Sequence, residues 1–125
     1  MKKLIILFFI NSVFSQQQIL DIDYKKMSEI IENESTVVVD VRTADEFNSL
    51  RIKNSINIDY YSKDFLDSIS SFKDKKNIIL YCRSGRRSYY AAKLLQQKGF
   101  NNIYNLEGGI LEVKKKNLEF KSLNN

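Results

Sequence analysis

Residues 78–88 read Ile-Ile-Leu-Tyr-Cys-Arg-Ser-Gly-Arg-Arg-Ser, and their pattern is the strongest indication of the fold in the sequence. Its first four residues form a continuous apolar run, which is typical of a strand buried on both faces. From Ser88 onward, apolar residues recur at helical spacing as far as Lys98-Gly99, where the glycine indicates the end of a helix. We therefore expect a buried strand, a short loop and a helix, with Cys82 at the carboxyl end of the strand.

Strands and helices are expected to alternate along the rest of the chain. After a short apolar piece at 18–22, the β-branched and apolar runs predict strands at 36–41, around 55–58, at 78–81 and at 103–106. Helical spacing predicts helices after Asp23, Thr43 and Ser62, from Ser88, and from Gly109 to Asn117. This alternation predicts the α/β class, with an open and mostly parallel sheet.

Three of these helices carry a signal at their first residue. Asp23 can cap a helix whose apolar face holds Tyr24, Met27, Ile30 and Ile31. Thr43 and Glu46 have the spacing of a capping box, which predicts a short helix that carries Phe47 inward. Ser62 can cap the helix that follows it.

The loop after the central strand has the composition of an anion-binding site. Ligands of open α/β sheets bind beyond the carboxyl ends of the strands, where Cys82 is expected. Backbone N–H groups, the start of a helix and three guanidinium groups would stabilise a thiolate there, and Gly85 allows the tight backbone path. The alternative is a buried, inert cysteine, but such a site does not normally have three arginines nearby. The candidate residues of this loop are Cys82, Arg83, Ser84, Gly85, Arg86, Arg87 and Ser88.

Composition excludes several other kinds of site. The chain has no histidine and one cysteine, so it can form neither a Cys-His pair, nor a His-ligated metal site, nor an internal disulfide. We expect no metal and no cofactor. The formal charge is +5, and removal of Lys2 and Lys3 would leave 18 basic against 15 acidic residues, far from the excess of a nucleic-acid-binding protein.

Residues 1–15 have the pattern of an export signal. Lys2 and Lys3 precede an apolar run from Leu4 to Ile10, and we expect cleavage between Ser15 and Gln16. The alternative is a membrane anchor, but the run is shorter than the ~20 residues that a span requires. We therefore expect a signal peptide at 1–15, a domain at 16–125, a periplasmic or secreted location, and no stable membrane anchor after cleavage.

The length of the cysteine loop separates two classes of enzyme. Cysteine-dependent phosphatases have five residues between the cysteine and the arginine that holds the oxyanion, which would place an arginine at position 88. Position 88 is a serine, and the last arginine is Arg87. The loop is thus one residue too short for a phosphatase.

Four stretches, taken together, resemble the rhodanese-homology family. They are Val39-Asp40-Val41-Arg42 with Glu46-Phe47, the 52–58 region, the loop 82–88, and Asn105-Leu106-Glu107-Gly108-Gly109-Ile110. The resemblance covers about residues 18–120. It implies a five-stranded parallel sheet flanked by helices on both faces, and a sulfurtransferase that carries a sulfane sulfur as a cysteine persulfide.

The resemblance also implies roles for individual residues. Cys82 would be the nucleophile and persulfide carrier, and residues 83–87 would bind the donor, mainly through Arg86 and Arg87. Asp40 and Arg42 would be a supporting pair beneath the site, with Ser88 also in support. The implied partners are a small anionic donor such as thiosulfate and a thiophilic acceptor such as cyanide or a thiol. A sulfur-relay or binding module without turnover, which exchanges sulfur with a protein donor or acceptor, stays open as the alternative.

Overall fold

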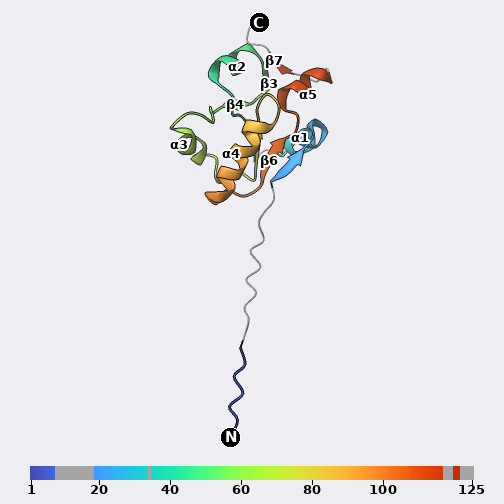
Figure 1. Cartoon of the computed structure of the whole chain (residues 1–125). Coiled ribbons are helices and arrows are strands. Elements are labelled where there is room, and N and C mark those ends of the chain that lie inside the picture. The colour runs from blue at the N-terminus through green and yellow to red at the C-terminus, as the bar shows by residue number, and fades with distance from the viewer. Residues whose placement is uncertain (8–18, 34, 117–119, 122–125) are drawn as a thin grey trace.

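Five strands form one parallel sheet in the order β1-β6-β5-β2-β4 (Figure 1). The computed structural model describes residues 1–7, 19–33, 35–116 and 120–121. The strands are β1 (Leu20–Ile22), β2 (Thr36–Asp40), β4 (Ile56–Asn57), β5 (Asn77–Tyr81) and β6 (Ile103–Leu106). All five residues of β5 are buried, as expected for a central strand that is covered on both faces.

Helices cover both faces of this sheet. They are α1 (Tyr24–Ile31), α2 (Ala44–Ser49), α3 (Phe65–Ser70), α4 (Arg86–Gln97) and α5 (Gly109–Lys115). Side chains of α3 and α4 pack with Ile78 and Leu80 on one face of β5, and side chains of α1 and α5 pack with Ile79 and Tyr81 on the other. The predicted α/β fold, a five-stranded parallel sheet between two layers of helices, is confirmed.

A second, two-stranded sheet was not predicted. β3 (Arg51–Ile52) pairs antiparallel with β7 (Phe120–Lys121). Strands of two residues are too short to have a periodic pattern, so the sequence gives no signal for them.

Two predicted helix starts are wrong by two residues. α4 begins at Arg86 rather than at Ser88, because Gly85 takes a positive φ of 97° and serves as the N-cap. α3 begins at Phe65 with Asp64 as its N-cap, whereas Ser62 was expected to cap it. The Ser62 hydroxyl instead accepts a hydrogen bond from the Asp64 amide at 3.2 Å, which forms a turn before the helix.

The other two predicted caps are confirmed. Asp23 accepts from the Lys26 amide at 2.8 Å, and Thr43 and Glu46 form the capping box of α2. Ile31 was expected on the buried face of α1 but is exposed, since it is the last residue of that helix. α5 ends at Lys115, and Asn117, the predicted end, lies outside the described residues.

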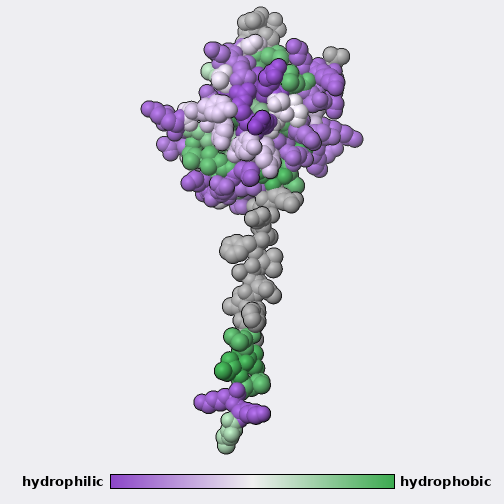
Figure 2. Space-filling model, in the orientation of Figure 1, coloured by the Kyte–Doolittle hydropathy of each residue, from purple (hydrophilic) through white to green (hydrophobic). Residues whose placement is uncertain are grey.

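The N-terminal residues 1–7 form neither helix nor strand, and their side chains are exposed. Figure 2 shows Leu4–Leu7 as an apolar stretch, whereas the face of the domain in this view is mostly hydrophilic. Within the described ranges, no helix has the length and apolar character needed to cross a membrane. The predicted cleavage point between Ser15 and Gln16 lies outside the described residues.

Candidate active site

Cys82 follows the last residue of β5 and lies at the base of the loop that leads into α4. Only 1% of the residue is exposed. Its Sγ accepts a hydrogen bond from the Gly85 amide at 3.2 Å, and the Ser88 hydroxyl lies 3.4 Å away. The cysteine packs in the core, but its sulfur has hydrogen-bond donors from Gly85 and Ser88, which an inert cysteine in a wholly apolar core lacks.

These donors decide the protonation of the thiol. Burial alone would raise the pKa of Cys82, but hydrogen bonds from the Ser88 hydroxyl and from the amides of Ser88, Ser84 and Gly85 together lower it below its ordinary value. The sequence predicts a direct contribution from the three arginines as well. Burial is the largest single influence on the Cys82 pKa, and the hydrogen bonds together outweigh it, while the charge of Arg87 also interacts with Cys82. The groups that lower the Cys82 pKa are thus mainly uncharged hydrogen-bond donors.

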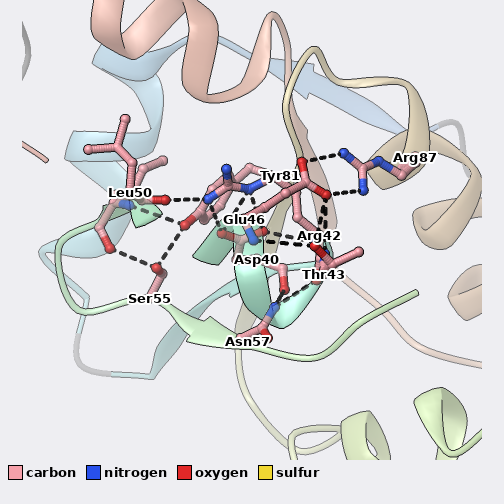
Figure 3. Close-up of polar contacts among 10 residues, drawn as sticks. Asp40, Arg42, Thr43, Glu46, Leu50, Ser55, Asn57, Tyr81 and Arg87 are labelled. Atoms are coloured by element: carbon pink, nitrogen blue, oxygen red, sulfur yellow. Dashed lines mark hydrogen bonds and ion pairs between the residues drawn. The ribbon is translucent and has the colours of Figure 1, made fainter. Parts of the chain in front are cut away.

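The three arginines of the loop differ in their surroundings. Arg83 and Arg86 are exposed. Arg87 is half-buried, and its guanidinium binds the carboxylate of Glu46 on α2 through two hydrogen bonds, of 2.8 and 2.9 Å (Figure 3). The Arg87 guanidinium holds the pKa of Glu46 at about 2, and the pair raises the pKa of Arg87. The resemblance implies that Arg87 contacts the sulfur donor. In this structure its guanidinium is bound to Glu46 on α2.

α5 supports the loop from behind. The amides of Ile110 and Leu111 donate to the carbonyl groups of Cys82 and Arg83, at 3.0 and 3.1 Å. This close approach requires glycine at position 109, because a Cβ there would lie 2.4 Å from the Cys82 carbonyl oxygen. The start of α5 thus lies directly against the backbone of Cys82.

Sequence reasoning assigned no role at the site to Asn105 on β6, nor any to Asp21 on β1. The Asn105 amide nitrogen donates to the Gly85 carbonyl at 3.1 Å and to the Asp21 carboxylate at 2.9 Å. Its Oδ1 accepts from the Ser88 hydroxyl at 2.5 Å. The sequence signal for Asn105 was a polar residue within an otherwise apolar strand, and the structure shows that this residue is buried. Asp21 is exposed, and the sequence gives no signal for it.

Asp40 and Arg42 form a buried ion pair at the carboxyl end of β2 (Figure 3). The Arg42 Nη2 lies 2.6 Å from the Asp40 Oδ2 and also 2.6 Å from the carbonyl oxygen of Leu50, the C-cap of α2. At the other end of α2, Thr43 caps the first turn. The pair therefore helps to place α2, which carries the Glu46 partner of Arg87.

No metal centre is evident at this site. Within residues 1–7, 19–33, 35–116 and 120–121, histidine, cysteine, aspartate and glutamate side chains form no group of three that could hold a metal ion. The arrangement offers a cysteine sulfur whose pKa is lowered by donors of the loop, in a segment that carries three arginines. Such a site can attack an electrophilic atom of a small anion.

Comparison with known proteins agrees with this geometry. The model of the Rhodanese-like domain family matches residues 23–116. A sulfurtransferase of Allochromatium vinosum is 30% identical over 92 residues, which are 73% of this chain and 84% of that protein. The crystal structure of a rhodanese-related protein from Thermoplasma volcanium has a TM-score of 0.69 and 30% identity, and covers 84% of this chain and 99% of that one.

Longer proteins also match. A tRNA uridine(34) hydroxylase of Pelagibacter ubique is 37% identical over 95 residues, which are 75% of this chain. The chain spans about a third of the length of that protein, 32%. The similarity to the hydroxylase is thus confined to one part of it.

Proposed function

Because the chain belongs to the rhodanese-like family, we propose that it moves a sulfane sulfur from thiosulfate to a thiophilic acceptor through a persulfide on Cys82. The observation that carries this proposal is the buried Cys82 sulfur with hydrogen-bond donors from Gly85 and Ser88. Such donors favour the thiolate, which is the nucleophilic form. No histidine is required.

The proposed reaction has two displacements at sulfur. The Cys82 thiolate attacks the outer sulfur of thiosulfate, an S–S bond forms, and sulfite leaves with the electron pair of the broken S–S bond. Cyanide then attacks the outer sulfur of the persulfide, thiocyanate forms, and Cys82 leaves as a thiolate. The backbone donors of the loop would stabilise the anionic sulfur at both stages.

Intact-mass measurement after exposure to thiosulfate tests the first displacement. We expect a gain of one sulfur atom in the natural protein, loss of that gain after addition of cyanide, and no gain in Cys82→Ser. The serine hydroxyl has no base nearby and remains protonated near neutral pH. Sulfur transfer by Cys82→Ser, or no persulfide from any donor, would contradict the proposal.

Arg87→Ala should have a different effect from Cys82→Ser. Loss of a charge-assisted contact with the donor should weaken thiosulfate use by roughly 1.5 to 3 kcal/mol, while Cys82 remains open to alkylation. Steady-state kinetics at several thiosulfate concentrations, with iodoacetamide labelling as the control, measures both. Unchanged thiosulfate kinetics would remove Arg87 from the donor site.

The relay function is the second candidate, and the exposed Arg83 and Arg86 at the rim are compatible with a protein partner. A natural protein that takes sulfur from a protein persulfide but none from thiosulfate would favour the relay. Hydrolysis of aryl phosphates that depends on Cys82 would instead contradict the argument from loop length.

A further inference from the structure

The Ser88 hydroxyl lies between two acceptors and has one hydrogen to donate. Ser88 is fully buried. Its Oγ lies 2.5 Å from the Asn105 Oδ1 and 3.4 Å from the Cys82 Sγ. The hydroxyl can donate to one of these atoms at a time. The atom that receives the hydrogen decides whether Ser88 supports a thiolate.

The orientation of the Asn105 amide is fixed by its partners. Both of its N–H hydrogens are used, one by the Asp21 carboxylate and one by the Gly85 carbonyl. The reverse orientation would place the Asn105 oxygen against these two acceptors, which would repel it. The Asn105 Oδ1 therefore always faces Ser88, and the charge of Asp21 strengthens this arrangement.

We propose that Asn105, held by Asp21, is a positioning residue that gives the Ser88 hydroxyl a second acceptor. The hydroxyl donates to the Cys82 sulfur when that sulfur is a thiolate, and turns to Asn105 when the sulfur is uncharged. The uncharged forms are the thiol and the inner sulfur of a persulfide, and the persulfide half of the proposal rests on the proposed function. The hydroxyl rotates, and no bond to hydrogen breaks.

The proposal predicts how Asp21 affects the thiol. The charged groups on the segments that meet at the sulfur are the exposed Arg83 and Arg86, Arg87 with its partner Glu46, and Asp21 behind Asn105. Because Asp21 strengthens the acceptor that competes with the thiolate, it works against ionisation of Cys82. Weakening the bond between Asp21 and Asn105 should leave the Ser88 hydroxyl more available to the sulfur.

Asp21→Asn is the direct test, because the side chain is exposed and its size is kept. Below the midpoint of the pH profile, iodoacetamide alkylation of Cys82 should become about twofold to fivefold faster, since a charge-assisted bond is replaced by a neutral one. Ser88→Ala should slow the same alkylation about tenfold, because the thiolate loses a donor. Asp23→Asn is the control, because it removes an equal charge two residues away and its side-chain oxygen can still cap α1. We expect it to leave the alkylation rate of Cys82 unchanged.

The double variant separates positioning from simple charge. If Asp21 acts through Ser88, Asp21→Asn should have no effect on alkylation in the Ser88→Ala background. The effect of Asp21→Asn should also persist in ~1 M salt, where charges are screened beyond about 3 Å, and this measurement needs no change at Ser88. An unchanged profile in Asp21→Asn, an equal shift in the double variant, or loss of the shift in salt would each overturn the proposal.

The result of these alkylation measurements does not depend on the proposed function. Alkylation uses no sulfur donor, so absence of persulfide with thiosulfate and with every other donor tried would refute the proposed function and leave the alkylation result intact. Conversely, normal sulfur transfer with an unchanged alkylation profile in Asp21→Asn would refute only the positioning role.

Discussion

The ion pair between Glu46 and Arg87 joins α2 to the first turn of α4. The two residues are 41 positions apart in the sequence, and each side chain is partly accessible to solvent. A bidentate contact of this kind fixes the direction of the guanidinium. Glu46 therefore limits how Arg87 can reach a bound anion.

The pair should make the stability of the protein depend on pH. The pKa of Glu46 falls from 4.5 to about 2 in the folded chain, so its contribution is complete above pH 4.5 and is lost as the pH falls toward 2. The free energy of unfolding of the natural protein should exceed that of Glu46→Gln near neutral pH, and the difference should shrink between pH 4.5 and 2. Urea denaturation at several pH values measures it.

Glu29→Gln is the matched control for this series. Glu29 pairs with Lys26 at 3.5 Å, with both side chains more than half exposed, and such pairs contribute little. We expect a small difference that hardly changes with pH. A difference for Glu46→Gln that stays constant down to pH 2 would show that the carboxylate charge of Glu46 is not what stabilises the pair.

At the scale of elements, the contact between α5 and the cysteine loop should be sensitive to a single methyl group. Gly109→Ala would place a Cβ 2.4 Å from the Cys82 carbonyl oxygen, a backbone atom, so the loop or α5 must move. We expect a loss of several kcal/mol in the free energy of unfolding, on the order of a severe backbone or overpacking change. Alkylation of Cys82 at neutral pH should also become slower, because the loop donors are displaced.

Gly99→Ala separates the clash from the cost of an unusual backbone. Gly99 also has a positive φ, but a Cβ there would meet the Lys73 Nζ at 3.7 Å, an ordinary contact. We expect a loss of about 1 kcal/mol in urea denaturation and an unchanged alkylation rate. Equal losses in the free energy of unfolding for the two glycine variants would mean that the close contact between α5 and the loop adds nothing to the cost of Gly109→Ala.

Elements with strong local signals could be predicted from the sequence. The apolar run of β5, the capping box of α2 and the glycine at the end of α4 each lie within a few adjacent residues, and each was located closely. The start of α4 was misplaced because Gly85 was treated as part of a loop and not as its N-cap. The pairing of β3 with β7 depends on contacts between distant segments and had no local signal.

The candidate site was predictable to the same extent. Cys82 and its loop are contiguous, so composition and spacing pointed to them. The contribution of Asn105 and Asp21 depends on β1 and β6 lying side by side, 84 residues apart in the sequence, and no spacing rule gives that contact. The pairing of Arg87 with Glu46 was missed for the same reason.

At the scale of the whole molecule, we propose that residues 1–15 are an export signal. The basic start and the apolar run from Leu4 support it. Protein made in a bacterial host should begin at Gln16, and N-terminal sequencing or peptide mass mapping checks this. Intact Met1 on most of the material would contradict the proposal.

The order of the strands has a consequence for the nascent chain. Cys82 leaves the ribosome before Gly85, Ser88, Asn105 and the amides of α5, all of which build its surroundings. Until those later residues have been synthesised and β6 has paired with β1 and β5, we expect the cysteine to react as an ordinary thiol, because it lacks these donors. We therefore expect Cys82 to become reactive only after β6 and α5 have been synthesised and have folded, so a nascent chain that ends before them would carry an unactivated cysteine.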